Sequence, residues 1–154
     1  MARSRTRYGP TSKRWIGLGS FLKRGRLVLD AGGVLALARR DPRAIATMVM
    51  AARRDLEVVV PAPVIAQVHR SGRGGERVDG VLRLVDVSIP TSAGIARAAG
   101  ELLGASGQSD AVDAIVVAEA LAAAPAFILT SDHADLRAIL GDQPDRARVS
   151  VISV

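Results

Sequence analysis

The chain has 154 residues, of which 49% are hydrophobic, and these values favour one folded domain with a core of normal size over a disordered chain. It contains no cysteine, which excludes disulfide bonds, thiolate catalysis and zinc–thiolate sites. The net charge of +6 is unevenly distributed: residues 1–26 hold eight basic side chains and no acidic one. The rest of the chain is therefore close to neutral, which argues against a domain that binds polyanions over its whole surface.

Residues 1–26 form a basic N-terminal extension that differs in composition from everything after it. This extension contains Tyr8, Trp15 and Phe21, which are three of the four aromatic residues of the chain. Its glycines and Pro10 interrupt any long helix, so we expect a flexible extension. The alternative is a nucleic-acid-binding arm, in which arginines contact phosphates and aromatic rings stack on bases.

The remaining sequence alternates short apolar runs with longer amphipathic segments, which predicts alternating strands and helices. The predicted strands are residues 27–29, 57–60, 85–89, 126–130 and 148–154. The predicted helices are residues 33–40, 42–54, 62–70, 76–84, 92–105, 110–123 and 132–140. Asp41 and Pro42 suit the N-cap and first position of the second helix, and the Gly-rich segment 71–75 predicts a flexible loop.

This order of elements predicts an α/β fold in which residues 27–154 make one domain. Short, almost continuously apolar strands that are separated by helices indicate a mostly parallel sheet of four to five strands covered on both faces. Ligands of such sheets bind beyond the carboxyl ends of the strands. The residues that follow each strand are therefore the first candidates for a functional site.

Membrane insertion and secretion are not expected. The most apolar stretch, residues 111–129, contains Asp113, Glu119 and Pro125, whereas a spanning helix needs about 20 nearly charge-free residues. The apolar run after the basic extension contains Asp30 near its start, which does not suit a signal peptide. We expect a cytoplasmic protein without a membrane partner.

Four aspartates occupy positions that suit chemistry. Asp30 follows the first predicted strand, and Asp132 follows the strand 126–130 by two residues. Asp110 and Asp113 begin a helix, where their spacing places them on one face. If these positions converge, the carboxylates repel one another, and Mg²⁺ or Mn²⁺ relieves the repulsion and activates a water molecule.

Each of these acids also has an ordinary structural interpretation. Asp132 suits the N-cap of the helix that follows it, and Asp110 suits the first turn of its own helix. Glu119 lies nine residues after Asp110, about half a turn around that helix, so it is left out of the site as a surface acid.

Three segments resemble the PIN-domain ribonuclease family. Residues 27–37 (LVLDAGGVLAL) resemble the opening strand and first acid of PIN domains, residues 113–118 (DAIVVA) their later acid-bearing helix, and residues 128–132 (ILTSD) their last acidic strand end. The resemblance covers about residues 27–140 in the order and separations expected of the family. It implies a single PIN-like domain that acts as an endoribonuclease with Mg²⁺ or Mn²⁺.

The resemblance also implies roles for individual residues. Asp30, Asp113 and Asp132 correspond to catalytic metal ligands of the family. Asp110 joins them or replaces Asp113 as the inner ligand, and the spacing to Asp132 favours Asp113. Thr130 or Ser131 corresponds to a residue that holds a metal-bound water.

One position departs from the family pattern. In the segment PAPVIAQVHR, residues 61–70, Gln67 stands where PIN domains usually have a glutamate. An amide can coordinate a metal or position a water molecule, but it contributes no charge and cannot act as a base. An alternative function is therefore a weak or inactive PIN-like module that binds RNA or a protein partner.

Small PIN proteins resemble the VapC-type toxins of type II toxin–antitoxin pairs. This resemblance implies an RNA substrate, a co-encoded antitoxin as partner and a homodimer. Arg70, Arg73 and Arg77 surround the Gly-rich segment 71–75 and are candidates for contacts with the RNA backbone. A solvated loop between two helices explains the same residues equally well.

A second enzyme class shares part of the pattern. Residues 29–35 (LDAGGVL) also resemble the nucleophile motif of haloacid-dehalogenase-like phosphatases. Residues 127–130 (FILT) resemble the second motif of these enzymes, which ends in a threonine. The enzymes need a lysine and further acids after that threonine, but no lysine follows Lys23 and only 24 residues follow Thr130. The nuclease is therefore the better interpretation.

Overall fold

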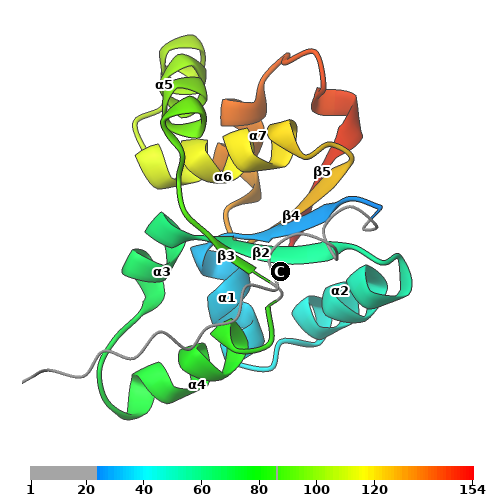
Figure 1. The fold of residues 1–154 in the computed structure, drawn as a ribbon, viewed down its shortest axis with the longest axis vertical. Coiled ribbons are helices and arrows are strands. Elements are labelled where there is room, and N and C mark those ends of the chain that lie inside the picture. Colours follow the sequence, from blue (N-terminus) through cyan, green and yellow to red (C-terminus); the bar gives the residue numbers. More distant parts are fainter. Residues whose placement is uncertain (1–23, 86) are drawn as a thin grey trace, which may run out of the picture.

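The computed structural model describes residues 24–85 and 87–154, without the side chains of residues 73 and 87. The proposed RNA-binding arm in residues 1–23 lies outside these described residues. The described chain is an α/β domain with a parallel five-stranded sheet in the order β3-β2-β1-β4-β5, which confirms the predicted fold class (Figure 1). The strands are β1 (Arg26–Leu29), β2 (Glu57–Pro61), β3 (Val87–Ile89), β4 (Ala126–Thr130) and β5 (Val149–Ser153).

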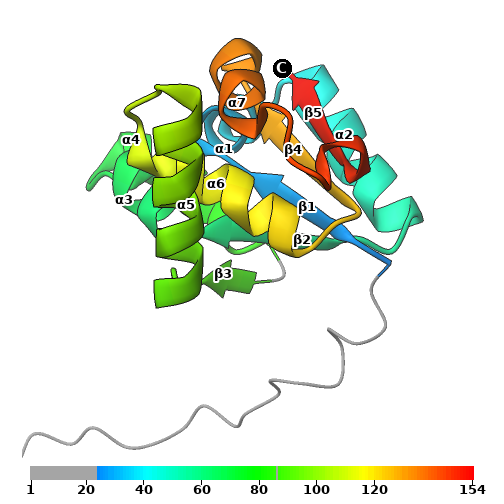
Figure 2. The same ribbon diagram turned by 90° about the horizontal axis from the view of Figure 1, so that it is seen from above.

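Two layers of helices cover the sheet. Helices α1 to α4 lie on one face and α5 to α7 on the other, as Figures 1 and 2 show from two directions. No helix among the described residues is long and apolar enough to cross a membrane. The helices are α1 (Ala31–Ala38), α2 (Pro42–Arg53), α3 (Ala62–Val68), α4 (Arg73–Leu82), α5 (Ala93–Ser106), α6 (Ala111–Ala122) and α7 (His133–Leu140), and a 3₁₀ turn (Arg146–Arg148) precedes β5.

The core lies on both faces of the sheet, around the central strand β1 and its neighbour β4. Leu27, Val28 and Leu29 of β1 have no exposed surface, and neither do Ile128 and Leu129 of β4. Strands that are covered on both faces must be apolar at consecutive positions. This is why these strands appear in the sequence as unbroken apolar runs.

The Gly-rich segment is largely helical, so the predicted loop over residues 71–75 is wrong from Arg73 onward. Helix α4 begins at Arg73 with Gly72 as its N-cap. A side chain at Gly75 would collide with the carbonyl oxygen of Arg70, so glycine is required there by close packing. The helix forms against the local preference of its glycines because the tertiary structure holds it in place.

Glu119 is buried on α6, which corrects its interpretation as a surface acid. Only 6% of its surface is exposed, and Arg26 at the start of β1 lies 3.5 Å from its carboxylate. The same guanidinium donates two hydrogen bonds, of 3.0 and 2.8 Å, to Glu57 at the start of β2. Burial raises the pKa of Glu119, and the charge of Arg26 opposes that rise.

Candidate active site

The strand order places two of the predicted aspartates beside each other. β1 lies between β2 and β4, and its register pairs Leu29 with Leu129. The backbone N–H of Asp30 donates to the carbonyl of Leu129 at 3.2 Å. The chain continues from β1 to β2 on one side and from β4 to β5 on the other, and open α/β sheets bind ligands at such a point of divergence.

Asp30 is a buried carboxylate that caps a helix. It is the N-cap of α1, it accepts a 2.6 Å hydrogen bond from the N–H of Gly33, and 4% of its surface is exposed. Burial raises the pKa of Asp30, while hydrogen bonds from the Thr130 hydroxyl and the Gly33 N–H oppose the rise, and the nearby charge of Asp132 adds to it. Burial thus leaves the charged form of Asp30 poorly solvated, so that its carboxylate takes up a proton more readily than an exposed one.

Two glycines let the first turn of α1 rest on the end of β4. A Cβ atom at Gly32 would overlap the hydroxyl of Ser131, and one at Gly33 would overlap the carbonyl of Leu129. Any larger side chain would push α1 away from β4. The double glycine therefore fixes the position of Asp30 relative to Ser131.

Thr130 connects the two strand-end aspartates. Its side chain is fully buried, its hydroxyl accepts a 2.7 Å hydrogen bond from the N–H of Asp132, and it donates to the carboxylate of Asp30. Asp132 itself is exposed and caps α7, where it accepts from the N–H of Asp135 at 3.5 Å. Thr130 is therefore a positioning residue that both aspartates depend on.

Helix α6 brings the remaining two predicted acids to the same place. Asp110 is exposed and caps α6, with its carboxylate accepting from the N–H groups of Val112 and Asp113 at 2.8 and 3.0 Å. Asp113 is partly buried one turn further on. Burial first, and then the charges of Asp110, Asp30, Asp132 and Asp135, raise the pKa of Asp113 to about 6.

The electrostatic coupling of Asp113 reveals an acid that the sequence analysis missed. Asp135 lies in the first turn of α7, and its charge is one of those that raise the pKa of Asp113. The available signal was its spacing of three residues from Asp132, which places both acids on one face of α7. The site therefore gathers acids from the beginnings of α1, α6 and α7.

We expect the metal-free protein to lose stability as the pH rises from about 4 to about 6, because Asp113 binds its proton more tightly in the folded state than in the unfolded state. The contribution of Asp113 is about 1–2 kcal/mol after allowance for its partial exposure. Urea unfolding in chelator at pH 5 and pH 7 measures it. Asp113→Asn should reduce the difference, whereas Glu101→Gln, at an exposed position of α5, should leave it unchanged; an equal pH effect in both variants would contradict this assignment.

Gln67, Arg70 and Arg77 are not among the groups that shift the pKa of Asp30 or Asp113. Gln67 is exposed on α3. Arg70 is exposed and donates to the carbonyl of His69 at 2.6 Å, while Arg77 lines a groove between α1, α2 and α4. The side chain of Arg73 lies outside the described residues, so the predicted contacts of these arginines with RNA stay a prediction.

The carboxylates share one electrostatic environment but are not arranged as a closed coordination shell. Among residues 24–154, residue 86 excepted, no group of three or more His, Asp or Glu side chains is placed to hold a metal ion. The chemistry of the donors nevertheless fits a hard divalent cation, since all are carboxylates and their mutual repulsion favours one. The side chains of Asp110 and Asp132 are exposed and cap the helices that they begin.

No protein-family model matches the chain, and no curated protein matches it.

Proposed function

We propose that this chain is a metal-dependent endoribonuclease of the PIN type, which hydrolyses RNA phosphodiester bonds with Mg²⁺ or Mn²⁺. The observation that carries the proposal is the raised pKa of Asp113, to which three other predicted site acids contribute besides burial. Repulsion between carboxylates lowers the stability of the folded state. Groups with pKa values perturbed in this way are concentrated at functional sites. The resemblance to PIN domains supplies the reaction and the RNA substrate.

The residues that would hold the cation are Asp30, Asp113 and Asp132, and Asp110 either joins them or takes the inner position. The partial burial of Asp113 and its coupling to Asp30 favour Asp113 as the inner ligand. A bound divalent cation supplies Lewis-acid stabilisation of the phosphoryl oxygens and activation of water.

The chain itself orients the carboxylates and supplies a positive electrostatic potential from the helix N-termini at the site. Thr130 holds Asp30 by its hydroxyl and receives the N–H of Asp132, so the two carboxylates keep a fixed relation. Three helices begin at the site, and their N-terminal ends favour an anionic phosphate group there. By the same resemblance Ser131, which is exposed beside Gly32, would hold a water molecule.

The first experiment is cleavage of structured RNA by the purified full chain with Mg²⁺, with Mn²⁺ and with EDTA. We expect cleavage with either metal and none with EDTA. RNA binding in EDTA that yields no product after Mn²⁺ is added would instead establish the binding module, in which Gln67 replaces the glutamate usual in the family.

Gln67→Glu tests whether α3 takes part in the site. If Gln67 faces the cation, the added carboxylate should tighten Mn²⁺ binding roughly tenfold and keep or raise cleavage. Calorimetric titration with Mn²⁺ measures the affinity, and Gln143→Glu, which adds the same charge elsewhere, is the matched control. Equal affinities for Gln67→Glu and the unmodified chain would remove α3 from the site.

The partners follow from the same resemblance. A VapC-type toxin acts on RNA, forms a homodimer and is inhibited by an antitoxin that is encoded beside it, and we propose these three partners for this chain. The mass of the purified protein in solution, measured by light scattering, tests the homodimer separately from the nuclease.

A further inference from the structure

Strand β5 forms one edge of the sheet, and among the described residues no strand lies on its outer side (Figure 1). β5 pairs with β4 over its whole length, and the N–H of Val154 donates to the carbonyl of Thr130. Because backbone groups alternate in direction along a strand, those of Val151 and Ser153 point away from β4. The outer side of β5 is therefore a row of hydrogen-bond donors and acceptors that suits a further strand.

β5 lacks the features that usually protect an edge strand from such pairing, which are short length, charged side chains, proline and bulges. The opposite edge strand, β3, is protected, since it is three residues long and Pro90 follows it directly. β5 has five residues, and residues 149–154 (VSVISV) contain no charge, proline or glycine. Its pairing with β4 is continuous, without a bulge. The contrast between the two edges indicates that β5 associates with another strand.

The apolar side chains at this edge are incompletely covered. Val151, Ile152 and Val154 pack against the core but are only half-buried, and so is Phe127 on the neighbouring strand. A strand placed alongside β5 would remove more of this apolar surface from water, which favours association. Pairing at this edge therefore gains apolar contacts as well as backbone hydrogen bonds.

The outer side of β5 is complementary to itself. When two copies of β5 run antiparallel about a two-fold axis at Val151, this residue lies opposite Val151 of the second copy, and Val149 lies opposite Ser153. The outward N–H groups of Val151 and Ser153 then meet outward carbonyls, while the N–H of Val149 already donates to the carbonyl of Arg146. The central pair of valines gives a β-branched contact across the interface. A second copy of the chain therefore fits this edge.

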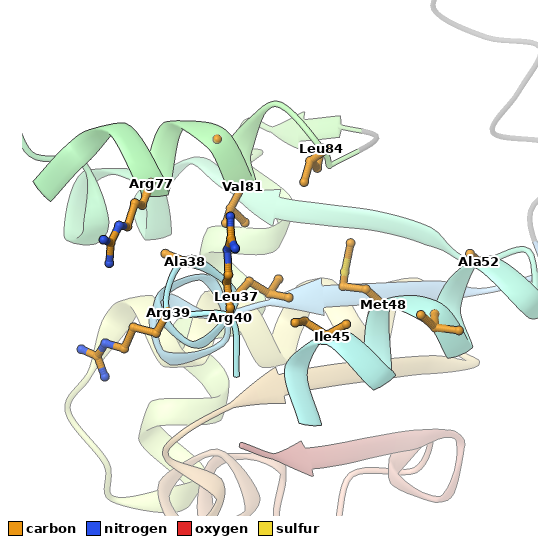
Figure 3. A pocket seen from close by; sticks show the side chains of 12 residues that line it. Leu37, Ala38, Arg39, Arg40, Ile45, Met48, Ala52, Arg77, Val81 and Leu84 are labelled. Carbon is orange, nitrogen blue, oxygen red and sulfur yellow. The ribbon is translucent and has the colours of Figure 1, made fainter. Parts of the chain in front are cut away.

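Charge disfavours a second copy in the apolar groove between α1, α2 and α4. The lining of this groove contains no acidic residue and includes three arginines, Arg39, Arg40 and Arg77 (Figure 3). Two further arginines, Arg53 and Arg54, lie at the end of α2. Two copies that faced each other across this groove would bring like charges together.

The β5 edge does not have this disadvantage. β5 itself carries no charged side chain. In the segment before it, Arg146 and Arg148 form ion pairs with Asp142 and Asp145, so the flank of the edge is neutral. Two copies of a chain with a net charge of +6 therefore meet at β5 without a local excess of positive charge.

We propose that two copies of the chain associate through antiparallel pairing of their β5 strands, which joins their two sheets into one continuous sheet. This inference names the interface of the proposed homodimer, and it does not rest on the nuclease. Because the strands of the two copies run in opposite directions, their carboxyl ends lie at opposite ends of the joined sheet. The two groups of carboxylates are therefore kept apart, and neither is covered by the pairing.

Amide hydrogen exchange, measured by NMR at several concentrations of the full chain, tests the pairing residue by residue. The amide hydrogens of Val151 and Ser153 should exchange severalfold more slowly in concentrated than in dilute protein, because they bond to the second copy. The amide hydrogen of Ile152, which points toward β4, is the internal reference and should be protected at every concentration.

Light scattering on the same samples separates the ways in which the proposal can fail. A monomer at every concentration would contradict the homodimer and its interface together. Rapid exchange of Val151 in a dimeric sample would place the interface elsewhere and overturn this inference alone. Slow exchange of Val151 in a monomeric sample would show that another segment of the same chain covers β5, and would also overturn it.

Val151→Pro tests the interface by removing one outward N–H. Proline is tolerated in an edge strand where the N–H faces away from the sheet, so the domain should remain folded by circular dichroism while the dimer is lost. Ser88→Pro is the matched control, because the N–H of Ser88 points away from β2 at the opposite edge. It should leave the dimer intact. A dimer that persists in Val151→Pro, or one that is lost equally in Ser88→Pro, would overturn the proposal, and the exchange measurement decides it if Val151→Pro does not fold.

Discussion

Asp30→Asn is expected to reduce metal-dependent RNA cleavage roughly 10²-fold or more, while the domain remains folded and at least as stable as before. Asparagine is also a good N-cap, so it can still accept the hydrogen bond from the N–H of Gly33. It removes a buried negative charge whose pKa is raised by burial and by Asp132. The substitution therefore separates the charge of Asp30 from its structural role at α1.

The measurements are initial cleavage rates with Mn²⁺, Mn²⁺ affinity by calorimetry, and unfolding in urea in the presence of chelator. Asp41→Asn is the matched control, because Asp41 is likewise an N-cap that accepts backbone hydrogen bonds, but at the start of α2. Cleavage by Asp30→Asn at the rate of Asp41→Asn would contradict the proposed centre. A large loss of stability in Asp30→Asn would show instead that the charge serves the fold.

Arg26→Met is expected to destabilise the domain by about 2–4 kcal/mol at pH 7. Arg26 is the cation between Glu57 and Glu119, whose side chains are 12% and 8% exposed. Removing it leaves two largely buried carboxylates without a partner, whereas methionine keeps most of the apolar length of the side chain. Urea unfolding compared between the variant and the unmodified chain measures the effect.

The pH dependence of this loss identifies its cause. Burial already raises the pKa of Glu119, and without Arg26 the folded state should bind the proton more tightly still. The penalty should therefore shrink as the pH falls toward 5, and adding Glu119→Gln to Arg26→Met should recover part of the stability. A penalty that is the same at both pH values would assign the effect to lost packing.

The fold was predictable because its central strands are buried on both faces. Runs such as residues 27–29 and 126–130 can be recognised as strands from their apolar character alone. The start of α2 was predictable because Asp41 is a favourable N-cap and Pro42 is favourable at the first helical position. The predicted helix over residues 76–84 overlaps most of α4, but its start at Arg73 was not predictable, since Gly74 and Gly75 disfavour a helix. The constraint at Gly75 is the carbonyl of Arg70, which is a packing contact and leaves no local pattern in the sequence.

The candidate site was predictable where it depends on strand ends and not where it depends on distant partners. Asp30 and Asp132 follow from the rule that parallel strands present ligand groups at their carboxyl ends, whereas Asp110 and Asp113 were predicted from their spacing at the start of a helix. The coupling of Asp135 to Asp113 depends on how α6 and α7 pack together, and the sequence does not encode it locally. Glu119 does face away from Asp110, but its partner Arg26 is 93 positions earlier in the chain and only the sheet brings them together.

The pairing of Leu29 with Leu129 also determines at what stage of chain synthesis the site can form. When synthesis has reached residue 110, β1 and β2 are present in the nascent chain. β4, which pairs with the other edge of β1, has not yet been made. The edge of β1 then has unpaired backbone groups, and Asp30 has neither Thr130 nor the support of β4. Because closure of a loop of a hundred residues is slow compared with local helix formation, the carboxylates meet among the last contacts made, and incomplete chains lack the arrangement that their proposed chemistry requires.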